Sequence, residues 1–224
     1  MGSKSRQIHI FFFPLMGYGH LIPMMDTTKL FAVQSVKETI VTTPRNGHYS
    51  PKCVARTNID IQIIKFPAVE AGLLEGCENI DLVTSLDMSH KFIQATKMLQ
   101  QPLEQLLEEY QPSCLVADMF FPWATDVAAK FGEIKLTRMQ LPDFTLQEVE
   151  TDFSKLFKEA IESELTSYRV VVNSFYELEP AYADHYRKVL GRKVWHIGPI
   201  SLCNKDLKIK PKGERKLPLM NMNV

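Results

Sequence analysis

The chain has 224 residues, 45% of them hydrophobic, and carries 26 basic and 26 acidic side chains. This length suits one domain, or one domain with a small tail, and the apolar content is ample for a packed core. Five of the basic residues and one acidic residue lie in residues 207–224, so the rest of the chain holds 21 basic and 25 acidic residues. That mildly acidic body gives no electrostatic reason to expect nucleic acid as a partner.

The cysteines, the histidines and the apolar runs indicate which compartment and which kinds of site to expect. The four cysteines are scattered without a C-x-x-C pair, and the histidines lack metal-ligand spacing. We therefore expect reduced thiols in a cytoplasmic protein and no metal site. The apolar stretch Ile8–Met16 is interrupted by Pro14 and lacks a small-residue cleavage site, which disfavours a signal peptide. Because no run is long enough to span a bilayer, we expect no stable membrane insertion.

Strand-like apolar runs alternate with helical patterns along the chain. We predict strands at Ile8–Phe13, Glu38–Thr42, Ile59–Phe66, Cys114–Ala117, Arg169–Asn173 and Val194–Ile197. We predict helices at Leu21–Val33, Leu82–Tyr110, Pro122–Phe131, Gln147–Thr166 and Leu178–Leu190. This alternation predicts an α/β fold, a Rossmann-like parallel sheet with helices on both faces.

One stretch breaks the alternation. The helix Pro122–Phe131 ends at Gly132, a suitable helix C-cap, and a strand should follow. Residues Glu133–Pro142 are instead polar and loop-like in composition. We therefore expect one strand to be missing between the strands at Cys114–Ala117 and Arg169–Asn173.

The turn Gly17-Tyr18-Gly19-His20 separates the first strand from the first helix. It places His20 at the carboxyl end of that strand, where open α/β sheets bind ligands, although a partly exposed turn histidine is the other reading. Gly17-x-Gly19 is half of a dinucleotide fingerprint. Ile22 stands where the third glycine belongs, and Thr42-Thr43-Pro44 offers no acidic residue for a ribose, which disfavours NAD binding.

Several motifs together resemble one family. They are Ile8–Pro14 with Gly19-His20-x-Ile22-Pro23, Thr42–Pro44, Ile64–Pro67, Ala117–Asp126, Asn173–Glu179 and Trp195–Pro199. The chain from about Gln7 to Asp206 resembles plant UDP-dependent glycosyltransferases of secondary metabolism, in particular those that glucosylate scopoletin, flavonoids and abscisate. At the turn the family commonly has a further histidine, where Tyr18 stands here.

The resemblance implies a GT-B fold of two facing Rossmann-like domains. The first domain would hold a small phenolic or terpenoid acceptor and the second a UDP-sugar, which is a co-substrate, so no cofactor is implied. The reaction would be an inverting transfer of a sugar, by this resemblance glucose, to an acceptor hydroxyl.

The resemblance also assigns roles to individual residues. It implies His20 as the general base and Asp118 as the carboxylate that orients and stabilises it. The usual strand order 3-2-1-4 would bring these two side chains together at one sheet edge. From the residues alone, Asp118 is more simply a helix N-cap before Pro122. The expected substrate-binding residues are Gly19, Tyr18, Phe120, Phe121 and Trp123, although such aromatic side chains more often belong to a core.

Compared with the family, the chain looks incomplete. We expect residues 1–206 to form the acceptor-binding domain, with a deletion junction at 132/133 where the family has a strand and several tens of further residues. Residues 207–224 match the family's usual continuation read one base out of frame, which predicts a disordered tail. The carboxyl-terminal domain with its His-Cys-Gly-Trp-Asn motif is absent, so UDP-sugar would bind only if such a domain were supplied.

Three functions follow as alternatives. The family assignment predicts a UDP-glycosyltransferase, and we expect this chain alone to be inactive. The second alternative is a non-catalytic fragment that binds an acceptor or a partner. The third is the product of a pseudogene or of a misassembled gene.

Overall fold

A computed structural model of the chain describes residues 7–32, 36–47, 59–131, 135–140, 152–178, 180–189, 191 and 193–204. The expected deletion junction at 132/133 and the tail at 207–224 lie outside the described residues, so both stay predictions.

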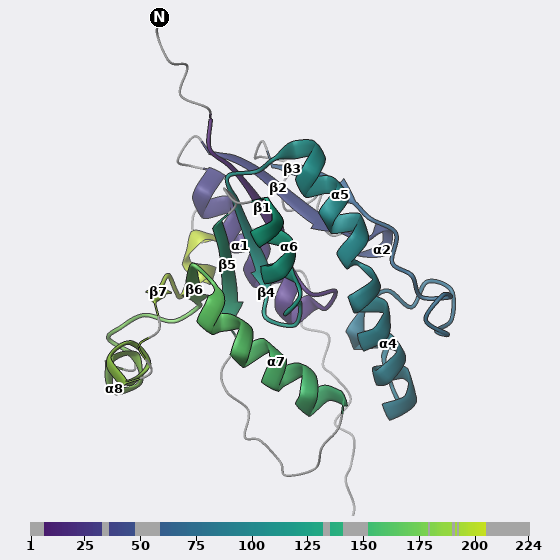
Figure 1. Cartoon of the computed structure of the whole chain (residues 1–224). Helices are drawn as coiled ribbons and strands as arrows, with labels where there is room; N and C mark the ends of the chain where they lie inside the picture. The colour runs from purple at the N-terminus through teal and green to yellow at the C-terminus, as the bar shows by residue number, and fades with distance from the viewer. Residues whose placement is uncertain are drawn as a thin grey trace, which may run out of the picture.

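The fold is built on a sheet of seven parallel strands in the order β3-β2-β1-β4-β5-β6-β7 (Figure 1). The strands are β1 (His9–Phe13), β2 (Lys37–Thr42), β3 (Asp60–Ile63), β4 (Cys114–Asp118), β5 (Lys135–Gln140), β6 (Arg169–Val172) and β7 (Val194–His196). The predicted α/β class is confirmed, and so is the position of β4 beside β1. Parallel pairing brings the carboxyl ends of all these strands to one edge of the sheet.

The helices connect the strands as crossovers. They are α1 (Tyr18–Ala32), α2 (Pro44–Gly47), α4 (Leu86–Met98), α5 (Gln100–Tyr110), α6 (Ala124–Lys130), α7 (Asp152–Thr166) and α8 (Pro180–Asp184). Short 3₁₀ segments form η1 (Ile80–Leu82) and η3 (Ile200–Asn204), and one π-helical turn forms η2 (His185–Val189).

Three predicted helices differ from the observed ones. The helix predicted at Leu178–Leu190 is the short α8 followed directly by the π-helical η2. The single helix predicted at Leu82–Tyr110 is two helices, α4 and α5, with Leu99 between them. The side chain of Ser85 caps α4 by accepting a hydrogen bond from the backbone N–H of Met88. Helix α1 begins at Tyr18 and not at Leu21, so Gly19 and His20 lie in its first turn.

Helices cover both faces of the sheet, since the side chains of β1 point alternately to one face and to the other. Phe11 and Phe13 pack on one face against apolar side chains of α4, α5 and α6, among them Phe92, Leu99, Leu103 and Val127. Ile10 and Phe12 pack on the other face against Leu21, Met24 and Met25 of α1. In Figure 1, α4 to α7 lie on the viewer's side of the sheet and α1 lies behind it.

The expectation of a missing strand is wrong. Residues Lys135–Gln140 form β5, which pairs in parallel with β4 on one side and with β6 on the other. The reason is that a parallel strand is held by backbone hydrogen bonds, which a polar sequence makes as well as an apolar one. An empty place between β4 and β6 would have left two rows of backbone groups unpaired inside the sheet.

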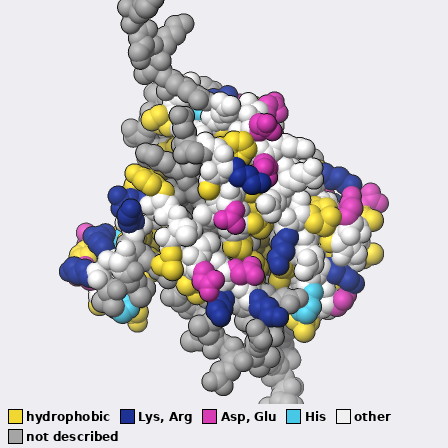
Figure 2. Space-filling view, in the orientation of Figure 1, with side chains coloured by type: hydrophobic (Ala, Val, Ile, Leu, Met, Phe, Trp, Pro, Cys, Tyr) yellow, Lys and Arg dark blue, Asp and Glu magenta, His cyan; other side chains and the backbone are white. Residues whose placement is uncertain are grey.

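Two further observations concern the charges on the surface and the length and hydrophobicity of the helices. On the face shown in Figure 2, acidic and basic side chains of the described residues are interspersed. Within the described ranges no helix is both long and apolar enough to cross a membrane.

Candidate functional site

The site begins at the turn between β1 and α1. Gly17 is buried; its carbonyl oxygen accepts hydrogen bonds from the backbone N–H groups of His20 at 3.1 Å and Leu21 at 2.8 Å. A Cβ atom added at position 17 would lie 2.6 Å from Cγ2 of Ile80 in η1. Glycine is therefore needed here because η1 crosses directly over the turn.

His20 and Asp118 meet at the carboxyl edge of the sheet. Nδ1 of His20 lies 2.8 Å from Oδ2 of Asp118, and the two side chains are 14% and 4% exposed. The other carboxylate oxygen, Oδ1, accepts a hydrogen bond from the backbone N–H of Phe120 at 3.1 Å. Asp118 is thus no N-cap of α6, which begins at Ala124. The predicted meeting of the two side chains is confirmed.

This hydrogen bond decides which ring nitrogen of His20 is available. An ionised carboxylate can only accept, so Nδ1 of the imidazole donates its hydrogen to Asp118. In the neutral ring the lone pair then lies on Nε2. The arrangement is that of a histidine whose tautomer is fixed by a buried carboxylate and whose second nitrogen can accept a proton.

The environment of His20 also changes its proton affinity. Burial acts to lower the pKa of His20, but the hydrogen bond that His20 donates to Asp118 and the charges of Asp118 and Asp81 act in the opposite direction and prevail. The net effect raises the pKa of His20 above its ordinary value of 6.5. The nearby carboxylates therefore stabilise the imidazolium that would form when the ring takes up a proton.

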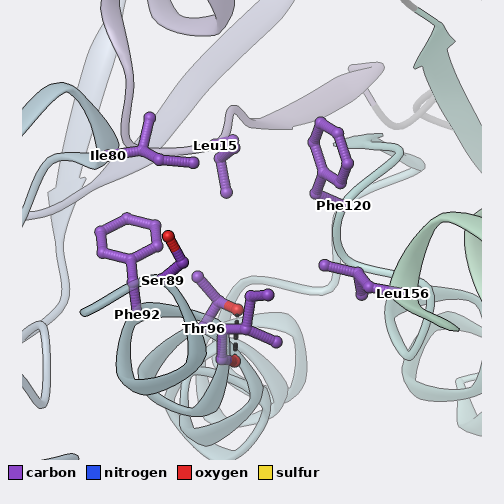
Figure 3. Close-up of a pocket in the computed structure, with 8 residues that line it drawn as sticks. Leu15, Ile80, Ser89, Phe92, Thr96, Phe120 and Leu156 are labelled. Atoms are coloured by element: carbon purple, nitrogen blue, oxygen red, sulfur yellow. Dashed lines mark hydrogen bonds between the residues drawn. The ribbon is translucent and has the colours of Figure 1, made fainter. Parts of the chain in front are cut away.

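An apolar cavity of about 150 Å³ lies close to this pair (Figure 3). Its lining comes from the β1–α1 turn, η1, α4, the loop after β4, and α7: Leu15, Ile80, Ser89, Phe92, Ile93, Thr96, Phe120 and Leu156. The hydroxyls of Ser89 and Thr96 donate to backbone carbonyls of their own helix, those of Ser85 and Ile93. Because none of the described lining residues carries a charged side chain, the cavity favours an uncharged apolar group.

Only one of the five predicted substrate-binding residues lines this cavity. Phe120 does so, and its ring meets that of His20 edge to face with the centroids 5.5 Å apart. Phe121 is fully buried and its ring stacks on that of Phe13 at 4.2 Å, so the structure places it in the core. Trp123 packs against the same core.

Tyr18 and Gly19 are not among the residues that line this cavity, and their predicted role in substrate binding stays a prediction. Both lie exposed in the first turn of α1, beside the cavity lining but not part of it. A Cβ atom added at Gly19 would have no heavy atom within 4 Å, so this position faces open space.

The remaining lining residues were missed from the sequence. Phe92, Ile93 and Thr96 lie on one face of α4, which a helical pattern could have indicated. Nothing in the spacing links them to Leu156 on α7 or to Ile80 in η1, since only the tertiary fold brings these elements together. In the described part of the chain, no three His, Cys, Asp or Glu side chains are grouped so that they could hold a metal ion.

Known proteins that are similar to this chain in sequence indicate its family. No protein-family model matches the chain. The UDP-glucose flavonoid 3-O-glucosyltransferase 7 of Fragaria ananassa is 46% identical over 259 aligned positions, which cover 96% of this chain and 52% of that protein. The scopoletin glucosyltransferase of Nicotiana tabacum is 42% identical to this chain, and the alignment covers 94% of this chain and 54% of that protein. By sequence, the chain is homologous to plant UDP-glycosyltransferases over about half of their length.

Solved structures of the family agree with this placement. The Glycyrrhiza uralensis glycosyltransferase UGT73P12, complexed with glycyrrhetinic acid 3-O-monoglucuronide, superposes with a TM-score of 0.78 at 30% identity over 90% of this chain and 51% of that one. Arabidopsis thaliana UGT89C1, complexed with UDP-L-rhamnose, superposes with a TM-score of 0.75 at 23% identity over 88% of this chain and 53% of that one. The predicted GT-B relationship is confirmed.

The family comparison also shows how much of a relative this chain represents. The chain spans about half the length of the curated relatives it matches. The alignment with the Fragaria protein is longer, at 259 positions, than the 224 residues of the chain. That relative therefore carries residues within the aligned region that have no counterpart here.

Proposed function

We propose that this chain supplies the acceptor-binding cavity and the general base of a UDP-glycosyltransferase. The reaction is the inverting transfer of a sugar, in this proposal glucose, from a UDP-sugar to a hydroxyl group of a small phenolic or terpenoid acceptor. The observation that carries the proposal is the 2.8 Å hydrogen bond between His20 and Asp118 beside an apolar cavity.

The two side chains divide the proton chemistry between them. Nε2 of neutral His20 takes the proton of the acceptor hydroxyl while the oxygen attacks the anomeric carbon. The new glycosidic bond forms on the face opposite the bond to UDP, which breaks and leaves its electron pair on the UDP oxygen. Asp118 keeps Nδ1 protonated and stabilises the imidazolium until the proton is lost to solvent.

The cavity supports a neutral ring-bearing acceptor. A volume of about 150 Å³ accommodates a group the size of a benzene ring. Burying a charged group against Leu15, Phe92 and Leu156 without a partner would be costly, whereas an apolar ring loses nothing there. A phenolic ring placed in the cavity is held next to Phe120, whose own ring contacts that of His20.

The relatives support the classes of both substrates. The two relatives named above are a flavonoid and a scopoletin glucosyltransferase, and one solved neighbour is complexed with UDP-L-rhamnose. In this proposal the UDP-sugar is bound by a second domain of the kind that the family resemblance implies. The free thiol of Cys77 supports a reducing, cytoplasmic location.

A second candidate function is favoured by the match to only half of each relative. In this alternative the chain alone binds an acceptor but transfers no sugar. Binding and transfer are separable, because in this proposal the cavity and the base lie in this chain and the UDP-sugar is bound by a second domain.

The experiment measures both properties. Scopoletin is titrated against the chain by its own fluorescence, with Leu156→Arg as the variant that places a charge in the cavity. Transfer is measured with UDP-glucose, for the chain alone and for a chimera with the carboxyl-terminal half of the Nicotiana relative. We expect binding by the chain, loss of binding in the variant, and transfer only by the chimera. An inactive chimera that still binds scopoletin would leave the second candidate, and absence of binding would contradict both.

A further inference from the structure

Asp81 bonds to the helix turn that carries the proposed base. Its Oδ2 accepts a hydrogen bond from the backbone N–H of Tyr18 at 3.0 Å. Tyr18 is the first residue of α1, and His20 follows two residues later in the same turn. The carboxylate therefore occupies the positive end of the helix that carries His20, where a negative charge is favourable.

Two buried asparagine side chains, linked by a hydrogen bond, hold the backbone of Asp81 in place. Oδ1 of Asn79 accepts from the backbone N–H of Asp81 at 2.8 Å, and Nδ2 of Asn79 donates to Oδ1 of Asn46 at 2.8 Å. Nδ2 of Asn46 donates in turn to Oγ1 of Thr43 at 2.8 Å and to the carbonyl oxygen of Glu78 at 3.0 Å. Asn79 and Asn46 are 6% and 2% exposed. Buried amides that are satisfied in this way hold one geometry.

The backbone ties the same segment to the turn before the base. The N–H of Ile80 donates to the carbonyl oxygen of Met16 at 2.7 Å, and the side chain of Ile80 lies directly over Gly17. The network thus runs from the end of β2 through η1 to the end of β1. The backbone of Asp81 is therefore held between these anchors, which places its carboxylate within reach of the first turn of α1.

The charged groups around His20 indicate how Asp81 affects proton binding by the imidazole. Burial lowers the pKa of His20, the hydrogen bond and charge of Asp118 raise it, and the charge of Asp81 raises it further. Further along α1, Asp26 and Lys29 pair with each other at 2.8 Å. Because Asp81 is exposed and Asp118 is buried, solvent screens the charge of Asp81 more strongly, so its effect is the smaller of the two.

We propose that Asp81 is a positioning residue for His20, which holds the first turn of α1 in place and adds a second carboxylate charge to the site. Its meaning for catalysis rests on the proposed function. Its effect on the imidazole does not, and can be measured on the chain as it exists.

The experiment is an NMR titration of the histidine side chains in the full chain. Asp81→Asn keeps an oxygen that can accept from Tyr18 but removes the charge, and Asp81→Ala removes both. We expect the titration midpoint of His20 to move to lower pH in both variants, by less than in Asp118→Asn. Hydrogen exchange of the Tyr18 amide should accelerate in Asp81→Ala and stay slow in Asp81→Asn.

The matched control is Asp87→Asn, which removes an exposed carboxylate paired with Lys91 on α4. It should leave the His20 midpoint unchanged, and the other histidine signals report folding in every variant. A His20 midpoint that stays constant in folded Asp81→Asn and Asp81→Ala would overturn the proposal. The midpoint does not depend on sugar transfer, so failure of the proposed function would be recognised separately.

Discussion

A histidine lies near each end of β1, His9 in the strand itself and His20 in the first turn of the helix that follows, and the two sites differ in chemistry. At the amino end, Nε2 of His9 lies 2.8 Å from Oγ1 of Thr39, and the ring packs edge to face on Phe11. At the carboxyl end, His20 is paired with the carboxylate of Asp118 and lies beside an apolar cavity. A hydroxyl partner satisfies a core histidine, whereas a carboxylate partner fixes a tautomer and stabilises a positive charge. The partner, more than the degree of burial, separates a structural histidine from a candidate base.

The largest expected difference between the two ends of β1 is in the effect that replacing each histidine has on the transfer rate. In the chimera with a donor domain, His20→Ala should lower the transfer rate by about 10² to 10⁴-fold, because the acceptor hydroxyl loses its base. His9→Gln is the matched control and should leave the rate close to that of the parent, since Gln can still bond to Thr39. Steady-state kinetics at neutral pH measure both, and equal losses in the two variants would erase the comparison.

Changing the partners tests why the ends differ. Because the pKa of His20 is raised, the transfer rate of the chimera should fall as pH decreases through that pKa and the base becomes protonated. Asp118→Asn should lower the rate by about two to four orders of magnitude and move this acidic limb to lower pH. Thr39→Val at the other end should lower stability without moving the limb. A pH–rate profile of each variant is the measurement.

The same pKa shift predicts how stability depends on pH. A histidine whose folded-state pKa is raised stabilises the fold fully below its unfolded pKa of about 6.5, and this contribution is lost as pH rises through the folded-state pKa. The difference in unfolding free energy between the parent chain and Asp118→Asn should therefore be largest in acid. Urea denaturation at several pH values checks this, and a difference that grows toward alkaline pH would contradict it.

The turn at the carboxyl end should tolerate little added volume. Gly17→Ala places a methyl group against Ile80 and should destabilise the chain by up to about 3 kcal/mol through overpacking. Ile80→Ala in the same chain should restore part of that loss. Gly19→Ala is the matched control, because nothing lies near that position and alanine favours a helix. Urea denaturation midpoints of the four proteins measure these effects, and equal losses for Gly17→Ala and Gly19→Ala would count against the turn geometry.

A buried carboxylate near the amino end gives the smallest expected effect, with the opposite sign. Glu38 pairs in register with Ile10, is 2% exposed, and its Oε1 has no hydrogen-bond partner among the described residues. Burial raises the pKa of Glu38 to about 6 from 4.5, so stability should decline as pH rises across that window. Glu38→Gln should therefore stabilise the chain at pH 7 by about 1 to 2 kcal/mol. Thermal unfolding at pH 4 and pH 7 tests this, since the gain should be present only at the higher pH.

Sequence reasoning succeeded where a single local signal determines the structure. The apolar runs at β1, β4 and β6 located buried parallel strands, and the family motif together with strand order brought His20 to Asp118. It failed where the backbone or the tertiary packing decides. Only two of the six residues of β5, Leu136 and Met139, are apolar, so the strand lacks the apolar run that located its neighbours, although both neighbouring strands pair with it.

The lining of the cavity shows the second kind of failure. Phe120 and Phe121 are adjacent in sequence and alike in chemistry, yet one lines the cavity and the other fills the core. The direction in which each side chain points is set by the path of the chain after β4. Composition and spacing cannot resolve that difference, whereas the hydrogen bond from the N–H of Phe120 to Asp118 fixes it.

The polar central strand β5 has a consequence for how such sheets change over time. In this sheet a largely polar segment of six residues fills the place between two strands, since the pairing groups belong to the backbone and every residue except proline supplies both of them. Insertions and deletions next to a central strand therefore need not destroy the sheet, provided that some nearby stretch can take over the pairing. The same property makes this position a suitable place to exchange a strand by grafting, with the histidine and its carboxylate left untouched on the neighbouring elements.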